Sequence, residues 1–372
     1  MTKHINPFKI LILAAFIGLP ALSHAAGNDD GSEKKKTISK SYTVTASDKL
    51  KIENSFGDVV INTWDKNEFK VDIEIYSKAT SDEKAQSILD KIKVSDSRSD
   101  NTIYFKTDVG HINGNNNNND KDDDGDDDKD EKDNKSNQSH HHKNYSNNNQ
   151  QFHINYVVYM PVGNPLQIEN SFGKTTVPDF KGLVSLTSKF GSLTAGNLDN
   201  AELVDVEFGE GHIGDMHNGK IIFKFDDKST VGKLSGIVKI ANEFSDLVQY
   251  NVSNNIEELT INESYSSIRV IVHKELSASF SIHTNFGDFH NNTDFNLNEK
   301  AEYDDDNSGV HFDKDYTGTS GDGKAKIKIK SSFGDIRLSH TAASKEEEKE
   351  HAEKKERKEK KEKKEKKEVE ES

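Results

Sequence analysis

The chain has 372 residues, 31% of them hydrophobic, a formal net charge of −15 at pH 7 and no cysteine. The lack of cysteine excludes disulfide bonds, thiolate metal sites, a cysteine nucleophile and a lipid anchor attached through cysteine. The acidic balance disfavours nucleic acid as a partner, because proteins that bind phosphate backbones carry basic stripes.

The first 25 residues have the features of an export signal. Lys3 and Lys9 give a basic start, residues 10–22 form an apolar run, and a Ser-His-Ala sequence ends at Ala25. We predict a signal peptide over 1–25, cleaved after Ala25, and a polar linker over 26–40. The apolar run is shorter than the roughly 20 residues that a membrane-spanning helix needs. The mature chain is therefore expected outside the cytoplasm, in the periplasm or beyond the cell, without a transmembrane anchor.

Residues 64–160 are predicted to form a cap at the start of a repetitive domain that spans 41–342. Alternating apolar residues predict strands near 69–75, 102–106 and 152–159. Ser81 is the expected N-cap of a short helix with its apolar residues between 85 and 92. Such a cap would cover the first coil of the repeat, because open sheet edges promote aggregation.

Residues 112–151 interrupt this cap with a tract of Asn, Asp, Lys, His, Ser and Gln. A tract of this composition buries too little apolar area to offset its ordering entropy, so a disordered insertion is predicted. Asp120, Asp122, Asp124 and Glu131 match the spacing of a calcium loop, which makes calcium a weak candidate, and no other cofactor is predicted. This spacing arises readily by chance in so acidic a tract. The histidines at 140–142 are an equally weak candidate for a metal site. So is a second acidic cluster at Asp304, Asp306, Ser308 and Asp315.

A short phrase recurs along the rest of the domain: an aliphatic residue is followed four positions later by an aromatic residue, often with glycine after it. From Phe172 to Phe286 the aromatic residues are 17 to 21 residues apart. The aromatic residues are Phe56, Phe172, Phe190, Phe208, Phe225, Phe244, Tyr265, Phe286 and Phe333, and the glycines are Gly57, Gly173, Gly191, Gly209, Gly287 and Gly334. A period of this length is typical of stacked coils that share one core.

Within each copy the apolar residues alternate, as they do in strands. This alternation predicts that the aliphatic and aromatic positions face inward and that equivalent aromatic rings stack in a column. The position two before the aromatic holds Asn, Ser or Thr in most copies, which we interpret as an internal polar ladder. The glycines are expected to turn corners with positive φ. The expected fold is an all-β parallel β-solenoid with about 18–21 residues per coil.

Residues 343–372 form a tail rich in Lys and Glu. Contacts between Glu and Lys three or four residues apart favour a solvated helix, and a disordered tail is the alternative. Its charges would also suit adhesion to a charged polysaccharide or to an envelope surface.

Three stretches resemble a known bacterial family. They read IENSFGDVVINTW, YVVYMPVGNPLQIENSFGKTTV and GTSGDGKAKIKIKSSFGDIRL, and they are similar to the "putative adhesin" family of β-strand-repeat proteins, a domain-of-unknown-function family. The resemblance covers residues 41–339 apart from the Asn/Asp insertion. It implies a right-handed parallel β-solenoid and an extracytoplasmic location, and it supplies no catalytic residues.

The leading functional hypothesis is a non-enzymatic envelope protein that binds an envelope, glycan or protein partner or has a structural role. A polysaccharide-acting β-helix enzyme is the first alternative, because Asp58, Asp288 and Asp335 recur two positions after the aromatic. Asp is also favoured at turns, however, and His212, His283 and His290 are scattered along the chain. The second alternative is a periplasmic stress-associated module that binds a protein by strand addition. The sequence indicates no oligomeric state.

Overall fold

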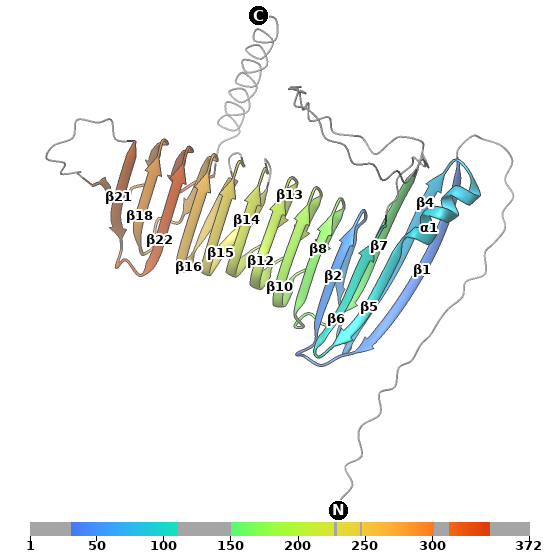
Figure 1. The fold of residues 1–372 in the computed structure, drawn as a ribbon. Coiled ribbons are helices and arrows are strands. Elements are labelled where there is room, and N and C mark those ends of the chain that lie inside the picture. Colours follow the sequence, from blue (N-terminus) through green and yellow to red (C-terminus); the bar gives the residue numbers. More distant parts are fainter. Residues whose placement is uncertain (1–30, 111–149, 227–228, 246–247, 301–311, 343–372) are drawn as a thin grey trace, which may run out of the picture. The chain divides into compact units, whose positions relative to one another are not determined.

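The computed structural model describes residues 31–110, 150–226, 229–245, 248–300 and 312–342. The chain divides into two compact units, Met1–Pro178 and Asp179–Ser372, and each is described by itself (Figure 1). The predicted signal peptide, the insertion with its calcium-loop residues, Asp304, Asp306 and Ser308, and the Lys/Glu tail lie outside the described residues. Within the described residues, no helix has the length and apolar character required to cross a membrane.

The first unit consists of two ladders of strands and one helix. Its elements are β1 (Ser32–Thr43), β2 (Lys49–Ser55), β3 (Val59–Thr63), β4 (Glu68–Ala79), α1 (Asp82–Lys91), β5 (Lys93–Ser99), β6 (Thr102–Asp108), β7 (Gln151–Met160), β8 (Leu166–Ser171) and β9 (Lys174–Val177). One ladder has the order β1–β4–β7–β3–β9, and the other has the order β5–β6–β2–β8. Pairs that involve β1, β4 or β5 are antiparallel, and the other pairs are parallel.

Helix α1 lies where the sequence predicts a helix, and Ser81 is its N-cap: the side chain accepts a hydrogen bond from the Lys84 amide. Ala85, Ile88 and Leu89 on this helix are buried. The polar linker expected over 26–40 is wrong from Ser32 onward, because β1 pairs antiparallel with β4 along its whole length. Lysine-rich sequence is compatible with a strand here because β1 pairs with β4 alone and lies at an edge.

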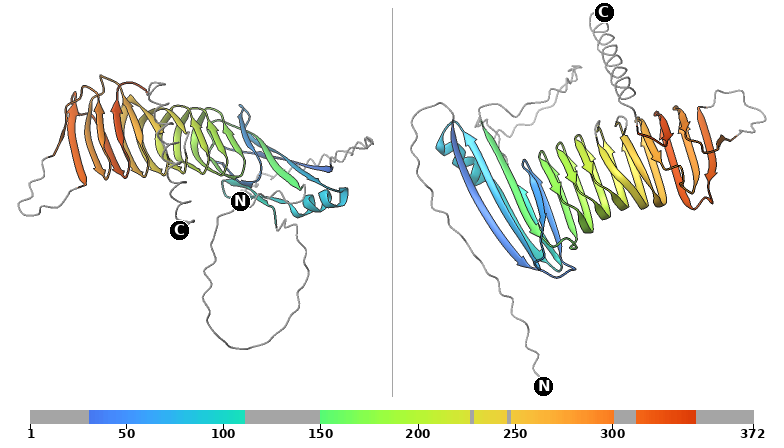
Figure 2. Two further views of the ribbon diagram at one scale, coloured as in Figure 1. Left: turned by 90° about the horizontal axis from the view of Figure 1, so that it is seen from above. Right: turned by 180° about the vertical axis from the view of Figure 1, so that it is seen from behind.

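The second unit is composed entirely of strands among its described residues. They are β10 (Phe180–Lys189), β11 (Ser192–Ala195), β12 (Leu198–Glu207), β13 (Glu210–Ile213), β14 (Met216–Lys224), β15 (Thr230–Glu243), β16 (Val248–Ser264), β17 (Ile268–Val272), β18 (Ala278–Asn285), β19 (Phe289–Asn292), β20 (Leu297–Glu299), β21 (Asp313–Ser320), β22 (Ala325–Ser332) and β23 (Ile336–Ser339). The longer ladder has the order β10–β12–β14–β15–β16–β22–β18–β21–β20, which Figures 1 and 2 show in large part. Its pairs are parallel except β18–β21 and β21–β20.

The all-β class is therefore confirmed, but the strand pairing is mixed rather than uniformly parallel. The chain order also changes near the end of the unit. Strand β22 lies between β16 and β18, and β23 lies between β17 and β19, so the last strands separate two earlier ones. The change of order follows from the turn at 321–324, which crosses the start of β18 and donates hydrogen bonds from the Asp322 and Lys324 amides to Ser277 Oγ.

The aliphatic positions of the repeat form the core, as predicted. Their parallel register aligns them from strand to strand, for example Ile240 with Ile261 and Ile261 with Ile329. All three side chains are at most 1% exposed.

The corners differ from the prediction. Positive φ, between 52° and 62°, occurs at the aromatic residue of each copy and not at the glycine that follows it. The glycine is required for space instead: a Cβ on Gly173 would lie 1.9 Å from the Gly57 carbonyl oxygen, and one on Gly209 would lie 2.0 Å from that of Gly191. At the glycine corners the backbones of neighbouring coils thus approach each other too closely for any side chain. Three other corners carry Asp226, Ser245 and Ser266 at this position, and there Ser245 Oγ and Ser266 Oγ accept hydrogen bonds from the amides of the neighbouring coil.

We expect Gly173→Ala to lower the free energy of unfolding by about 1–3 kcal/mol, because the added methyl group has only backbone to displace. Gly163→Ala in the same unit is the matched control, because a Cβ there would have no neighbour within 4 Å. Urea unfolding followed by circular dichroism measures both. Equal stability of the two variants would contradict the close approach.

Candidate binding surface

A continuous stack of aromatic rings runs along the corners of the second unit. In spatial order it contains Phe190, Phe208, Phe225, Phe244, Tyr265, Phe333, Phe286 and Phe312, and we call these eight residues the aromatic ridge. From Phe190 to Phe286 the ring centroids are 4.6–5.0 Å apart and the planes lie within 4° of parallel. Phe312, which the repeat pattern does not include, extends the stack at 4.5 Å from Phe286.

The predicted column of aromatic residues exists, but its predicted inward orientation is wrong. The ridge side chains are between 46% and 51% exposed. A residue in the left-handed conformation interrupts the strand alternation, so the ring leaves the inner face at the corner. Each interior ring covers the faces of its two neighbours, and the exposed part is therefore the ring edge.

The first unit has a shorter stack. Phe56 stacks on Phe172 with the centroids 4.9 Å apart, and Phe152 contacts Phe56 at 5.3 Å. Phe152 comes from β7, outside the repeat pattern, and a hollow of about 410 Å³ lies beside these rings. The hollow is also lined by Asp58, His153 and other polar groups.

Ionic pairs flank the ridge of the second unit. The residue before the ring alternates in sign through Lys189, Glu207, Lys224 and Glu243. Lys189 Nζ lies 3.0 Å from Glu207, and Lys224 Nζ lies 3.7 Å from Glu243. The ridge is thus an apolar strip beside a row of surface charges that largely compensate each other.

The recurrent aspartates serve the backbone of neighbouring coils. Asp335 Oδ1 accepts a hydrogen bond from the Asp288 amide at 3.1 Å, and Asp58 Oδ1 accepts one from the Lys174 amide at 2.8 Å. Asp288 also contacts Lys314 Nζ at 3.2 Å. This arrangement is the local backbone bonding expected at turns, and it leaves these carboxylates engaged structurally.

Beneath the corners, an internal row of polar side chains also forms hydrogen bonds to backbone groups. Asn54 Nδ2 donates to Asn170 Oδ1 at 3.1 Å, as the predicted polar ladder requires. Asn54 and Asn170 also donate to the Gly57 carbonyl at 3.3 and 3.1 Å, and Ser331 Oγ lies 2.7 Å from the Gly334 carbonyl. At these corners the row satisfies the carbonyl groups of Gly57 and Gly334, which turn inward. In three other copies the buried polar atoms at the same position have no hydrogen-bond partner within the described parts of the chain: Ser188, Asn242 and Thr284.

Glu263 occupies the same row, two positions before Tyr265, and is 3% exposed. Burial raises the pKa of this carboxyl group to about 8. Ser331 Oγ contacts both Glu263 Oε1 and the Gly334 carbonyl, but a hydroxyl group has only one hydrogen to donate. A protonated Glu263 resolves this conflict: it donates to Ser331, which in turn donates to Gly334. The repeat pattern did not single out Glu263, although its place among Asn, Ser and Thr marks it as an exception.

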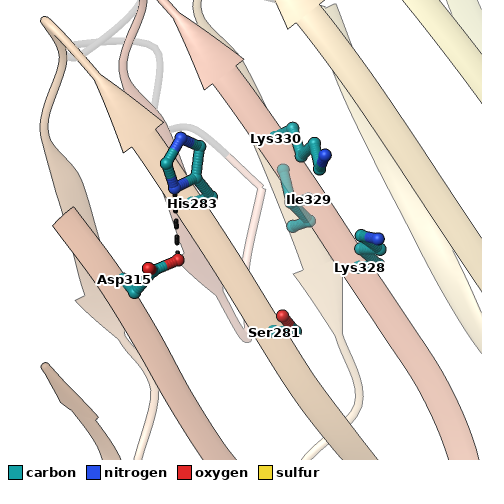
Figure 3. Close-up of a pocket in the computed structure, with 6 residues that line it drawn as sticks. All are labelled: Ser281, His283, Asp315, Lys328, Ile329 and Lys330. Carbon is teal, nitrogen blue, oxygen red and sulfur yellow. Dashed lines mark hydrogen bonds and ion pairs between the residues drawn. The ribbon is translucent and has the colours of Figure 1, made fainter. Parts of the chain in front are cut away.

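A second surface feature is a hollow of about 210 Å³ over β18, shown in Figure 3. Ser281 and His283 of β18, Asp315 of β21 and Lys328 and Lys330 of β22 line it. His283 Nδ1 lies 3.1 Å from Asp315 Oδ1. These residues include the types found in a Ser-His-Asp relay, but the other imidazole nitrogen points away from Ser281 (Figure 3), so the arrangement does not activate the serine.

The remaining predicted residues are not brought together. His212 Nδ1 lies 3.0 Å from Thr230 Oγ1, and His290 is on β19. Asp315, the described member of the second acidic cluster, contacts His283. The part of the chain that the structure describes contains no group of three or more His, Asp or Glu side chains placed to hold a metal ion.

We expect Phe225→Leu to lower the free energy of unfolding by about 1–3 kcal/mol, because it removes two ring contacts and leaves an aliphatic residue at positive φ. Phe225→Tyr is the matched control, since Tyr265 already holds the equivalent position. Chemical denaturation measures both changes. A Leu variant as stable as the Tyr variant would show that the stack does not hold the corner.

The raised pKa of Glu263 predicts a pH dependence of stability. Because the folded-state pKa of about 8 exceeds the ordinary value of 4.5, the folded chain retains a proton that the unfolded chain releases. Stability should fall as pH rises from about 4.5 to about 8, by up to about 1.4 kcal/mol per pH unit. Urea unfolding over this range, compared with Glu263→Gln, isolates the contribution. Parallel pH profiles for the two proteins would rule it out.

No family model matches this chain, and no curated protein matches it. Two solved structures align with most of its length. One is described as a "putative cell adhesion protein" from Clostridium sporogenes ATCC 15579, at 13% identity and a TM-score of 0.24, and the alignment covers 82% of this chain and 99% of that one. Another is a "putative adhesin" from Bacteroides fragilis NCTC 9343, at 13% identity and a TM-score of 0.34, with 82% and 97% covered. Similarity at this level identifies neither a family nor a function.

Proposed function

We propose that the chain is an exported, non-enzymatic protein of the bacterial cell envelope, built as a right-handed parallel β-solenoid, whose aromatic ridge binds an envelope partner. The proposal rests on the exposed apolar surface of the aromatic ridge. Eight half-exposed aromatic side chains in one line form a contiguous apolar strip. Contiguous apolar surface on a soluble protein is typical of an interaction site.

The stacking also restricts the chemistry of the partner. Interior rings cannot offer their faces to a ligand, because neighbouring rings occupy both faces. Their exposed edges carry the positive part of the aromatic quadrupole, which favours apolar groups and electron-rich oxygen atoms. We therefore expect an extended partner that contacts many ring edges weakly, rather than one small molecule held in a pocket.

A binding role also agrees with the state of the polar groups. Of the aspartates considered for catalysis, Asp58 and Asp335 accept hydrogen bonds from backbone amides and Asp288 pairs with Lys314. The imidazole of His283 is directed away from Ser281 (Figure 3). The proposed location is extracytoplasmic, on the basis of the N-terminal sequence and the family resemblance. The partner is an envelope component, a glycan or a protein.

The triple variant Phe208→Tyr, Phe225→Tyr and Phe244→Tyr tests the ridge without removing the stack, because Tyr265 is already part of it. Three added hydroxyl groups make the ring edges polar. In a depletion strain, we expect the wild-type gene to restore surface attachment, aggregation and envelope integrity, and the triple variant to restore them only in part.

Leu183→Tyr with Ile237→Tyr is the control for this experiment, because both side chains are exposed and lie outside the ridge. If depleted cells match wild-type cells in every assay, the envelope function is wrong. If the triple variant and the control restore the phenotype equally, the ridge is not the binding surface.

A further inference from the structure

The hollow over β18, which we call the groove, lies where a strand with small outward side chains runs beside a strand with long ones. Ser279, Ser281 and His283 point outward from β18, opposite Lys326, Lys328 and Lys330 of β22 in register. All three lysines are exposed, while the residues between them on β22 are buried. Lys328 and Lys330 line one side of the groove, Ser281 and His283 line its middle, and Asp315 of β21 lines the other side (Figure 3).

The positive charge of the three lysines is not compensated by ion pairs. No ion pair joins Lys326, Lys328 or Lys330 to an acidic side chain among the residues that the structure describes. The three ammonium groups share one strand face at intervals of roughly 7 Å. Beyond Thr260 of β16, Lys239 of β15 and Lys220 of β14 lie in the same row as Lys328, and both are exposed. The acidic groups nearby include Glu258, opposite Lys326, and Asp313 and Asp315 on β21, of which Asp315 contacts His283.

Protection of a sheet edge does not explain these lysines. Lysine on an edge strand prevents association with other chains, but β22 has neighbours on both sides, β16 and β18. Like charges about 7 Å apart on one exposed strand face repel each other weakly in water, and an anion between them would remove that repulsion. The placement thus indicates a ligand with several negative charges along its length.

We propose that the groove over β18 binds an acidic polysaccharide, a sugar polymer that carries carboxylate or sulfate groups. Ammonium groups of lysine bind such anions as point charges. The Ser281 hydroxyl of β18 and the hydroxyls of Thr317 and Thr319 on β21 can both donate and accept hydrogen bonds, as sugar hydroxyls require. Ser279 Oγ donates to the Ala325 carbonyl and can accept a further hydrogen bond. A straight strand with charges at regular intervals is suited to an extended polymer.

Other polyanions fit less well. Single-stranded nucleic acid is bound by stacking of bases on aromatic faces, and the faces of the ridge rings are covered by their neighbours. Duplexes require a broad basic surface, whereas these three lysines lie in a single row on one strand. The groove uses other side chains than the aromatic ridge, so the proposal does not depend on the ridge as a binding surface.

The experiment measures binding of the purified full-length chain to heparin and to polygalacturonate by isothermal titration calorimetry at two salt concentrations. Neutral dextran and single-stranded DNA are the comparison ligands. We expect both acidic glycans to bind, more weakly at the higher salt concentration, and dextran not to bind. The variant Lys326→Gln, Lys328→Gln, Lys330→Gln should lose about tenfold in affinity.

The matched control is Lys181→Gln, Lys233→Gln, Lys274→Gln, which removes the same charge from three exposed lysines outside the groove. It should retain wild-type affinity, and thermal unfolding checks that both variants fold. Equal affinity of the two variants, or no binding of either glycan, would overturn the site. DNA that binds as tightly and loses affinity in the same variant would overturn the assignment to polysaccharide.

Discussion

The structure depends on one constraint, the close approach of neighbouring backbones at the glycine corners. The residue after the aromatic lies so near the next coil that only glycine fits at Gly173 or Gly209 without displacement of backbone. The chain enters this turn through a non-glycine residue in the left-handed conformation, which costs about 1–2 kcal/mol. Ring stacking contributes about 0.5–1.5 kcal/mol for each pair, and because each pair is shared by two rings, a long stack supplies about one pair per corner. The aromatic residue thus offsets much of the strain of the corner that it occupies.

The same corner explains the internal polar row. A tight turn directs the carbonyl group of Gly57 or Gly334 inward, where an unpaired acceptor is costly. Asn170 and Ser331 donate to these carbonyls from the position two before the aromatic. Glu263 fits this row only as a protonated acid, because a carboxylate has no hydrogen to donate. Burial raises the pKa of Glu263, and the carboxyl group thereby keeps the proton that its place in the row requires.

Much of the fold was accessible from sequence, because it follows from local patterns. Period-two alternation predicted buried positions such as Ile240 and Ile261, and the Ser81 cap predicted α1. The direction of the rings was not accessible, since a single residue at positive φ reverses the face to which alternation assigns it. The insertion of β22 between β16 and β18 was also missed: similar repeats do not specify which copies become neighbours. For that reason the sequence could not place Lys328 beside Ser281.

The two lysine-rich strands, β1 and β22, have similar compositions but different positions in their ladders, and their lysines therefore need different explanations. On β1, which pairs with β4 alone, Lys34 lies 2.8 Å from Asp82 and Lys40 lies 3.3 Å from Asp96. Edge protection and ion pairing account for that strand without a ligand. Strand β22 has a similar composition but lies between two other strands, and neither explanation applies to its lysines. Because β22 carries this charge in the interior of a ladder, the lysines are better explained by a ligand than by the needs of the fold.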